Sequence, residues 1–381
     1  MMPAVIDLYA GAGGLSLGAS RAGFSVCAAV EIDSDAIKTH SANFPNTVHV
    51  QKDIMLLEGK DILQQAGIPQ KDLIGIIGGP PCQGFSAIGR GDVNDTRNKL
   101  FIKFFDLVSE LNPVFFLAEN VPGILNDKYA RIREEALAKI PGYTVLPPIP
   151  IDASEYGAPT TRIRIFFIGY RNCDQIKPLS IDDIEKRKVS DGEKTHVREA
   201  LEGIPADIRY TDTFKRERKL EEEYCKLDGI HGQSDFFYKR VISTIPRDVG
   251  NPEYIKMFQE KHLVNGCIPT KHSAVVRARY AKLRYNEQDS VSKSKRLDPC
   301  GFCPTLRAGT GPEKGSYQAV RPIHFQYNRV ITPREAARLQ GFPDWFKLPE
   351  TIWHSFRQIG NSVSPIVAEQ VLTAIYQKLI L

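Results

Sequence analysis

The sequence predicts an α/β fold with a doubly wound, mostly parallel sheet, followed by a second, smaller and irregular domain. Residues 3–170 alternate short apolar runs with amphipathic stretches. The apolar runs are typical of buried strands and lie at residues 5–9, 26–30, 73–77, 114–118 and 165–169. Between the last three, one helix face is formed by Leu100, Phe101, Phe104, Phe105, Val108 and Leu111. Strands and helices in alternation indicate a mostly parallel sheet.

The remainder of the chain divides at two places. From about residue 172 to 297 the periodicity is lost and charge clusters dominate, so we expect a separate irregular domain at residues 172–320 after a first domain at 1–171. Order returns in 321–381. Thr332-Pro333-Arg334-Glu335 has the features of a helix start and Gly341 those of a helix end. Ser364-Pro365 begins a final amphipathic helix.

Composition bounds the class of protein. The 381 residues, 42% of them hydrophobic, can fill more than one core. The sequence has neither an apolar run of about 18 residues nor a signal-peptide pattern, so we expect a cytosolic protein. Seven cysteines, an odd number, favour reduced thiols over a disulfide framework. The net charge of +5 suits a nucleic-acid partner but is weak evidence alone.

A glycine-rich loop follows the first strand, at residues 7–18. Glycines there let the backbone turn tightly and approach a ligand at a helix N-terminus. Glu31 ends the second strand and can accept hydrogen bonds from a ribose, while Asp53 is placed to reach an adenine. Ser16 stands where the dinucleotide fingerprint requires glycine, which disfavours a pyrophosphate cofactor. A nucleoside-like ligand is therefore expected, with a purely structural turn as the alternative.

Cys82 lies in the loop Gly78-Gly79-Pro80-Pro81-Cys82-Gln83-Gly84-Phe85-Ser86, directly after a buried strand. Such a loop presents its thiol at the crevice where open α/β sheets bind ligands. A buried, inert cysteine is the alternative. Glu119 ends the next strand at the same edge. A thiol and an acid on adjacent strand ends suit conjugate addition to a pyrimidine, in which sulfur attacks C6 and the acid assists at N3.

Three further features are less specific. Arg162 and Arg164 are two apart before a strand, so both could face the same site, although such pairs are often solvated. Cys300 and Cys303 have zinc-ligand spacing without a second pair, and no metal is expected. A basic stretch free of acids looks like a phosphate-contacting surface or a solvated helix face, and includes Lys271, His272, Arg277, Arg279, Lys282 and Arg284.

The order of these motifs resembles the DNA (cytosine-5)-methyltransferases over nearly the whole chain. Residues 7–18 resemble the family's S-adenosylmethionine loop, Pro80-Pro81-Cys82-Gln83 its nucleophile loop, and Glu119-Asn120-Val121 its catalytic glutamate motif. Arg162-x-Arg164 resembles its arginine pair, and residues 358–363 its C-terminal motif, for which chemistry alone suggests no role. The resemblance implies the S-adenosylmethionine-dependent methyltransferase fold, with residues 172–320 recognising the target and residues 325–346 supporting that region.

The resemblance also assigns roles to individual residues. The catalytic set would be Cys82, Glu119, Arg162 and Arg164. S-adenosylmethionine would be bound by Tyr9, Gly11, Gly13, Gly14, Glu31, Ile32, Asp53, Ile54, Pro81, Leu100, Asn361 and Ser362. Double-stranded DNA is expected to contact Gln83, Ser86 and Arg97, together with Lys271, Arg277 and Arg279 of the basic stretch. As a bacterial restriction-modification enzyme, the chain is expected to be a nucleoid-associated monomer paired with an endonuclease of the same specificity.

Some positions depart from the family pattern: Tyr9 replaces the usual Phe, Ile32 an aromatic residue found in some members, and Thr160 a common Gln. None of these removes a reacting group. The alternatives are a tRNA cytosine-5 methyltransferase, whose Cys-Phe-Thr tripeptide is absent here, a catalytically silent DNA-binding protein, and a nucleotide-dependent oxidoreductase. The recognised DNA sequence is not encoded in any pattern that can be translated.

Overall fold

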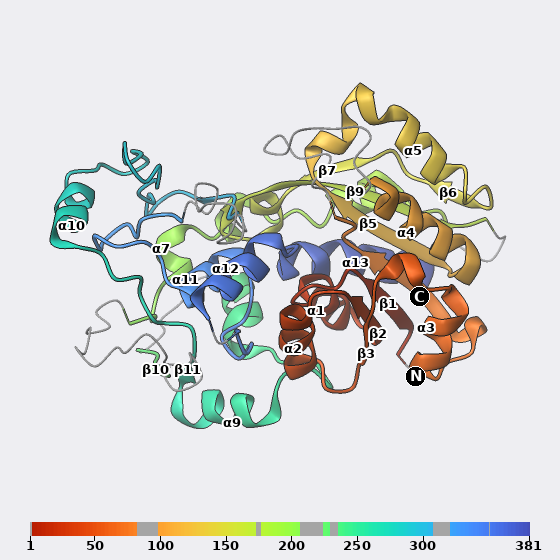
Figure 1. Cartoon of the computed structure of the whole chain (residues 1–381), viewed down its shortest axis with the longest axis horizontal. Helices are drawn as coiled ribbons and strands as arrows, with labels where there is room; N and C mark the ends of the chain where they lie inside the picture. Colours follow the sequence, from red (N-terminus) through yellow and green to blue (C-terminus); the bar gives the residue numbers. More distant parts are fainter. Residues whose placement is uncertain are drawn as a thin grey trace.

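A computed structural model describes residues 2–81, 98–172, 177–205, 224–228, 235–307, 321–349 and 351–381. Its described residues form an eight-stranded sheet in the order β3-β2-β1-β4-β5-β9-β6, with β7 also paired with β9 (Figure 1). The strands are β1 (Ala4–Leu8), β2 (Ser25–Glu31), β3 (Val48–Gln51), β4 (Leu73–Gly78), β5 (Phe115–Asn120), β6 (Tyr143–Val145), β7 (Ile149–Asp152) and β9 (Ile163–Arg171). The predicted fold class is confirmed.

Helices cover both faces of this sheet because successive strand residues point to opposite sides. In β5, Phe115 and Leu117 join one core and Phe116 and Ala118 the other. The first core is shared with α1 (Gly14–Ala22) and α13 (Pro365–Leu379), which lie side by side. The second is shared with α3 (Gly59–Ala66), α4 (Asn98–Leu111) and α5 (Ala130–Leu137).

Strand directions bring several predicted residues to one edge. The pairs β3-β2, β2-β1, β1-β4 and β4-β5 are parallel, so Leu8, Glu31, Gly78 and Asn120 all end strands at that edge. The strand β9 runs antiparallel to β5. Its first residues therefore lie where β5 ends, which places the arginine pair beside Glu119.

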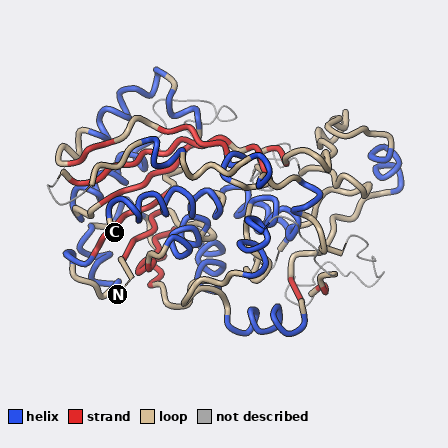
Figure 2. Tube along the Cα trace, turned by 180° about the vertical axis from the view of Figure 1, so that it is seen from behind, coloured by secondary structure: helices blue, strands red, loops and turns tan. Residues whose placement is uncertain are grey.

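The described residues after β9 form mostly short helices and short strand pairs. They include α6 (Ile181–Glu185), α7 (Val197–Ala200), α8 (Asp235–Tyr238), a π-helical turn (Lys239–Ser243), α9 (Pro252–Lys261) and α10 (Ala274–Ala281). Two short strand pairs accompany them: β10 (Cys225–Lys226) with β11 (Leu263–Val264), and β12 (Cys303–Pro304) with β8 (Thr160–Thr161). Figure 2 shows the main sheet in one half of the molecule and mostly loops and short helices in the other.

The C-terminal segment contains α11 (Pro333–Gln340), α12 (Ile352–Asn361) and α13. The predicted start of α11 is confirmed: Thr332 and Glu335 form a capping box, and Gly341 ends the helix with a φ of 93°. Buried arginines connect α11 to the irregular region. Arg334 donates to the backbone and side-chain oxygens of Asn265, and Arg338 donates to Ala200 and Glu202 and pairs with Asp344.

The expectation that the cysteines are reduced is wrong for one pair. The antiparallel β10-β11 pairing places Cys225 opposite Val264 and brings Cys225 and Cys267 together in a disulfide. That tertiary contact spans 42 residues and leaves no mark in the sequence spacing. Among the described residues, Cys27, Cys300 and Cys303 are free.

Candidate active site

The loop between β1 and α1 turns through left-handed backbone conformations. Tyr9, Gly11 and Gly13 have φ values of 59°, 56° and 95°. At Gly14 the reason for glycine is close approach, because a Cβ there would lie 2.3 Å from the carbonyl oxygen of Val363. A Cβ at Gly13 would lie 2.4 Å from the Phe44 ring, so Gly13 packs against α2 (Ser34–Asn43) behind the loop. The loop therefore packs closely against the C-terminal segment at Val363.

Glu31 fixes the shape of this loop. One carboxylate oxygen accepts from the backbone N–H of Gly11 at 3.0 Å, and the other accepts from the N–H groups of Ile32 and Asp33 at 2.8 and 2.9 Å. A carboxylate has about four acceptor positions. Backbone N–H groups occupy three of these acceptor positions, and one position on Oε2 remains for a ligand.

A buried polar chain lies behind the same loop. The Ser16 hydroxyl donates to Asp7 Oδ2 at 2.6 Å and lies 3.0 Å from Nε2 of His40, whose Nδ1 lies 2.8 Å from Nε2 of His49. Burial raises the pKa of Asp7 to about 7 and lowers the pKa of His40 well below its usual value. Ser16 therefore joins the ends of β1 and α2 through hydrogen bonds. In the sequence, this residue serves only as an argument against a dinucleotide site.

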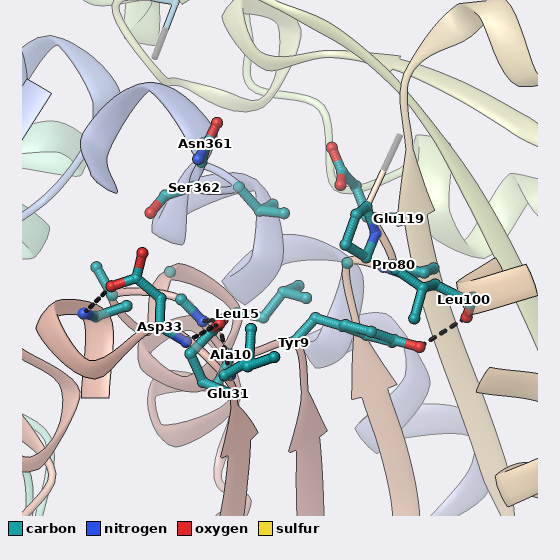
Figure 3. A pocket seen from close by; sticks show the side chains of 18 of the residues that line it. Tyr9, Ala10, Leu15, Glu31, Asp33, Pro80, Leu100, Glu119, Asn361 and Ser362 are labelled. Carbon is teal, nitrogen blue, oxygen red and sulfur yellow. Dashed lines mark hydrogen bonds between the residues drawn. The ribbon is translucent and has the colours of Figure 1, made fainter. Parts of the chain in front are cut away.

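The strand ends enclose a cavity of about 780 Å³. Figure 3 shows Glu31 and Asp33 on one side, Glu119, Pro80 and Leu100 on the other, and Asn361 and Ser362 above. The predicted residues that line it are Tyr9, Gly11, Gly14, Glu31, Ile32, Asp53, Ile54, Pro81, Leu100, Glu119, Arg162, Arg164, Asn361 and Ser362. Of the predicted residues that the structure describes, Gly13 faces α2 instead, and the three basic residues of the irregular region lie elsewhere.

Apolar groups form the wall near the ends of β2 and β3. The side chains of Ile32 and Met55 are 63% and 43% exposed and line the cavity. Asp53 accepts from the backbone N–H of Met55 through Oδ1. This combination of apolar surface and a neighbouring carboxylate suits a flat base with an exocyclic amine.

The opposite wall is tied to α4. The Tyr9 hydroxyl donates to the carbonyl oxygen of Leu100 at 2.7 Å. Burial, with smaller contributions from the Asp53 and Glu31 charges, raises the pKa of Tyr9, so the phenol stays neutral. The tyrosine hydroxyl, a departure from the family's phenylalanine, thus holds the loop to α4.

Glu119 is buried at the end of β5, and its Oε1 lies 2.9 Å from Nε of Arg164. Burial raises the pKa of Glu119, against the lowering effect of the Arg164 and Arg162 charges. The neutral acid is therefore favoured more than in a solvated glutamate, while the guanidinium orients it. A carboxyl group of this kind can donate a hydrogen bond or proton to a base nitrogen.

Arg162 differs from Arg164 although the sequence presents them as a pair. Its buried guanidinium donates to the carbonyl oxygens of Leu306 at 3.1 Å and Gly360 at 2.9 Å. It thereby joins the start of β9 to the end of α12. Arg162 is thus held by the backbone of two other segments, whereas Arg164 faces the acid.

Cys82, Gln83, Ser86 and Arg97 lie outside the described residues. The described chain before them is held at the cavity: Pro81 lines it, and the Asn120 side chain donates to the carbonyl oxygen of Pro80 at 3.3 Å. Gly79 lies against the acid, since a Cβ there would be 3.4 Å from Oε2 of Glu119.

Sequence reasoning missed an ion pair across the cavity rim. Arg357 on α12 lies 2.7 Å from Asp33, the N-cap of α2, and both line the cavity. The two residues are more than 300 positions apart, and nothing in their local sequence pairs them. Lys52 and Lys99 also line the cavity and were not predicted.

The remaining predicted features lie away from the cavity. Lys271 and Arg277 are exposed, whereas Arg279 pairs with Asp289 at 2.6 Å. Cys303 is buried and Cys300 exposed, and the described residues hold no group of three or more His, Cys, Asp or Glu placed to bind a metal. Thr160, where the family commonly has Gln, donates to the carbonyl oxygen of Cys303.

Comparison with known proteins decides which family has this site. The family model of the C-5 cytosine-specific DNA methylases matches residues 4–377. The chain belongs to this family. Its activity is therefore that of a DNA (cytosine-5)-methyltransferase, and the alternatives of an oxidoreductase and a silent DNA-binding protein lose their support.

Individual relatives agree with this family. The chain is 37% identical to the type II methyltransferase M.XorII of Xanthomonas oryzae pv. oryzae over 97% of its own length and 83% of the relative's. It is 33% identical to the type II methyltransferase M.DdeI of Desulfomicrobium norvegicum, covering 96% and 86%. Both relatives are thus named as type II methyltransferases.

Solved structures share the fold of this DNA methylase. A protein assigned as a DNA modification methyltransferase, encoded within a prophage of E. coli, superimposes with a TM-score of 0.86 at 46% identity over 98% of this chain and 99% of the other. The Dnmt2 methyltransferase of S. pombe gives a TM-score of 0.61 at 18% identity, over 98% of each chain, which shows the fold alone. None of the described helices has the length and apolar character of a membrane span.

Proposed function

We propose that the chain transfers a methyl group from S-adenosylmethionine to C5 of a flipped-out cytosine in a specific double-stranded DNA sequence. The observation that carries this proposal is the Glu119–Arg164 pair, which faces the same cavity as Glu31 and Asp53. The cavity thus has one end suited to a nucleoside cofactor and another suited to a pyrimidine. Pro81, the residue before Cys82, also lines this cavity.

The residues of the cavity fit S-adenosylmethionine. Glu31 retains one free acceptor position for a ribose hydroxyl. Asp53 with Ile32 and Met55 suits the adenine. The loop residues Gly11, Ala12 and Gly14, with Asn361 and Ser362, would enclose the amino-acid end. When bound, the cofactor supplies an electrophilic methyl group on a sulfonium. This assignment extends to Tyr9, Ile54, Pro81 and Leu100 as further wall residues.

The chain's own residues would activate the base. The Cys82 thiolate adds to C6, forming the S–C6 bond, while Glu119 gives a proton or hydrogen bond to N3 and the C5–C6 π electrons become available at C5. After C5 is methylated, its hydrogen leaves as a proton to a base or water. The S–C6 bond then breaks, C5=C6 re-forms, and N3 returns its proton to Glu119. Flipping of the base gives these groups access.

Target recognition is assigned to residues 172–320, supported by 321–381. In support of this division, Arg334 of α11 is buried and hydrogen-bonded to Asn265, and Asn265 in turn bonds to Leu348. These buried contacts would hold the recognition loops at a fixed position relative to the cavity. Lys271 and Arg277 would contact DNA there, with Gln83, Ser86 and Arg97 beside the flipped base; Arg279 would hold the loop through Asp289.

The biological setting follows the named relatives, which are type II methyltransferases. The protein would act as a monomer at the bacterial nucleoid, and protect DNA against an endonuclease of the same specificity.

Methyl transfer from labelled S-adenosylmethionine to duplex DNA and to tRNA tests this function. We expect label in DNA alone, at discrete cytosines. Cys82→Ser and Glu119→Gln should abolish transfer while cofactor binding, measured by calorimetry, is retained, because each removes a reacting group but little surface. Transfer to tRNA, or Cys82→Ser activity within tenfold of the unmodified protein, would contradict the proposal.

A further inference from the structure

The short helix α10 and the segments that flank it carry a concentration of positive charge. Residues 271–296 contain eight Lys and Arg against two acidic residues, whereas the whole chain has a net charge of only +5. The rest of the protein is therefore close to neutral. Figures 1 and 2 both show α10 at the extreme end of the molecule, away from the sheet.

One face of α10 is held firmly. Val276 and Tyr280, one helical turn apart, pack against Ile323 and Val330. The His272 ring meets the Tyr280 ring edge-on, at 5.3 Å between centroids. These contacts fix both the position and the rotation of the helix.

Polar contacts complete the anchor. Arg296 donates to the carbonyl oxygen of Tyr280 at 2.7 Å and to Asn328 at 2.6 Å. Arg279 forms an ion pair with Oδ1 of Asp289. The other oxygen, Oδ2, accepts hydrogen bonds from the backbone N–H and the hydroxyl of Ser292. The Arg279 guanidinium and the Ser292 groups hold the pKa of Asp289 at about 2, although burial opposes them, so this ion pair persists at physiological pH.

The opposite face of α10 is bare. It presents Val275, 74% exposed, on one side and the exposed Arg277 on the other, with alanines between them. No ion pair or hydrogen bond joins the Arg277 guanidinium to any residue in the described part of the chain. Phosphates account for the positive charge, and the exposed valine gives the same face an apolar group that the methyl group of a base can contact.

Resting on the proposed function, we propose that α10 enters the major groove of the target DNA, where Arg277 and Val275 read base edges. Arginine donates two parallel hydrogen bonds to guanine, and an apolar side chain contacts the methyl group of thymine. The surrounding Lys271, Lys282 and Arg284 would hold the backbone phosphates without selecting a sequence. In this arrangement the residues of α10 that contact bases differ from the neighbouring residues that contact phosphates.

Selection from a random duplex library tests the inference without needing catalysis. Bound sequences are recovered and sequenced for the unmodified protein, Arg277→Ala, Val275→Ala and the matched control Lys282→Ala. We expect Arg277→Ala to lose preference at one fixed position of the site by roughly 5- to 150-fold, the range of one good bidentate side chain–base contact, and Val275→Ala to lose preference at another position by a smaller factor. The control should bind all sequences more weakly with an unchanged preference.

The same proteins, used to methylate the library, give a second readout by bisulfite sequencing. An unchanged site in both reading variants would overturn the inference, as would a change of oligomeric state with Val275→Ala and no change of site, which would mean a second copy covers this face. If the unmodified protein selects a site but transfers no methyl group, the proposed function fails while the reading role is still tested. Melting temperatures of the variants verify that they remain folded.

Discussion

Nε of Arg164 lies 2.9 Å from Oε1 of Glu119, and burial raises the pKa of this acid even though the guanidinium opposes the shift. Removing the arginine charge should raise that pKa further. If Glu119 acts as the acid, kcat/KM falls at high pH as Glu119 ionises. Arg164→Ala should therefore lower the maximum by about 10²- to 10⁴-fold and move this alkaline limb to higher pH. The pH profile of methyl transfer measures both. If the alkaline limb of the profile does not move, it reports the ionisation of a group other than Glu119.

Gly14 is expected to tolerate no side chain. A Cβ there would lie 2.3 Å from the carbonyl oxygen of Val363, which is backbone and cannot rotate away. Gly14→Ala should cost about 1–3 kcal/mol of unfolding free energy and weaken cofactor binding. Gly142→Ala is the matched control, because a Cβ at exposed Gly142 would have nothing within 4 Å. Denaturant unfolding with calorimetry compares them, and equal stability of the two would refute the close approach.

The buried Arg338–Asp344 pair should respond asymmetrically to mutation. Its side chains are 1% and 0% exposed. Asp344→Ala leaves a buried cation without its partner and should cost about 3–5 kcal/mol, whereas replacing both with apolar residues should recover much of that loss. Lys256–Glu260, with side chains 72% and 57% exposed, is the control pair, and Glu260→Ala should cost under about 1 kcal/mol. Similar losses at both pairs would contradict this reading of the burial.

The exposed lysines of the basic segment should contribute to affinity through counterion release. Lys271→Gln with Lys282→Gln should weaken binding to every DNA sequence and reduce the slope of log Kd against log salt by about 2. Titrations over a range of salt concentrations measure the slope. An unchanged slope would remove these residues from the DNA interface.

The covalent step can be trapped with DNA that carries 5-fluorocytosine at the target. Fluorine cannot leave as a proton, so attack by Cys82 and methylation should be followed by arrest, with protein and DNA joined. The complex should survive denaturation, require S-adenosylmethionine and be absent with Cys82→Ala. It should persist when Cys300 and Cys303 are both changed to Ser. Peptide mapping to another cysteine would refute the nucleophile assignment.

The sequence predicted the strand ends well because apolar runs and the residues that follow them are local. Glu31, Glu119 and Arg164 therefore reach the cavity as expected. It could not separate Arg162 from Arg164, since their difference depends on the carbonyl oxygens of Leu306 and Gly360, far along the chain. Similarly, the spare acceptor of Glu31 is countable only once its three backbone donors are known.

The Arg357–Asp33 contact was missed for the same reason. Helix α12 itself has local signals that could have predicted it, because Thr351 is its N-cap and the apolar residues Ile352, Phe356 and Ile359 recur at helical spacing. The disulfide between Cys225 and Cys267 likewise depends on the pairing of β10 with β11. Strands of two residues are too short to show a recognisable pattern in the sequence.

The fit of Gly14 to Val363 has a consequence for synthesis of the protein. The loop at residues 9–14 leaves the ribosome early, but the surface that completes it follows about 350 residues later. At 5–20 residues per second, that interval is roughly 20–70 s. Throughout it the nascent chain lacks the wall that Asn361 and Ser362 provide. A ribosome that stops before α12 thus releases a product without a finished cavity, and methylation of DNA awaits the synthesis of residues 352–363.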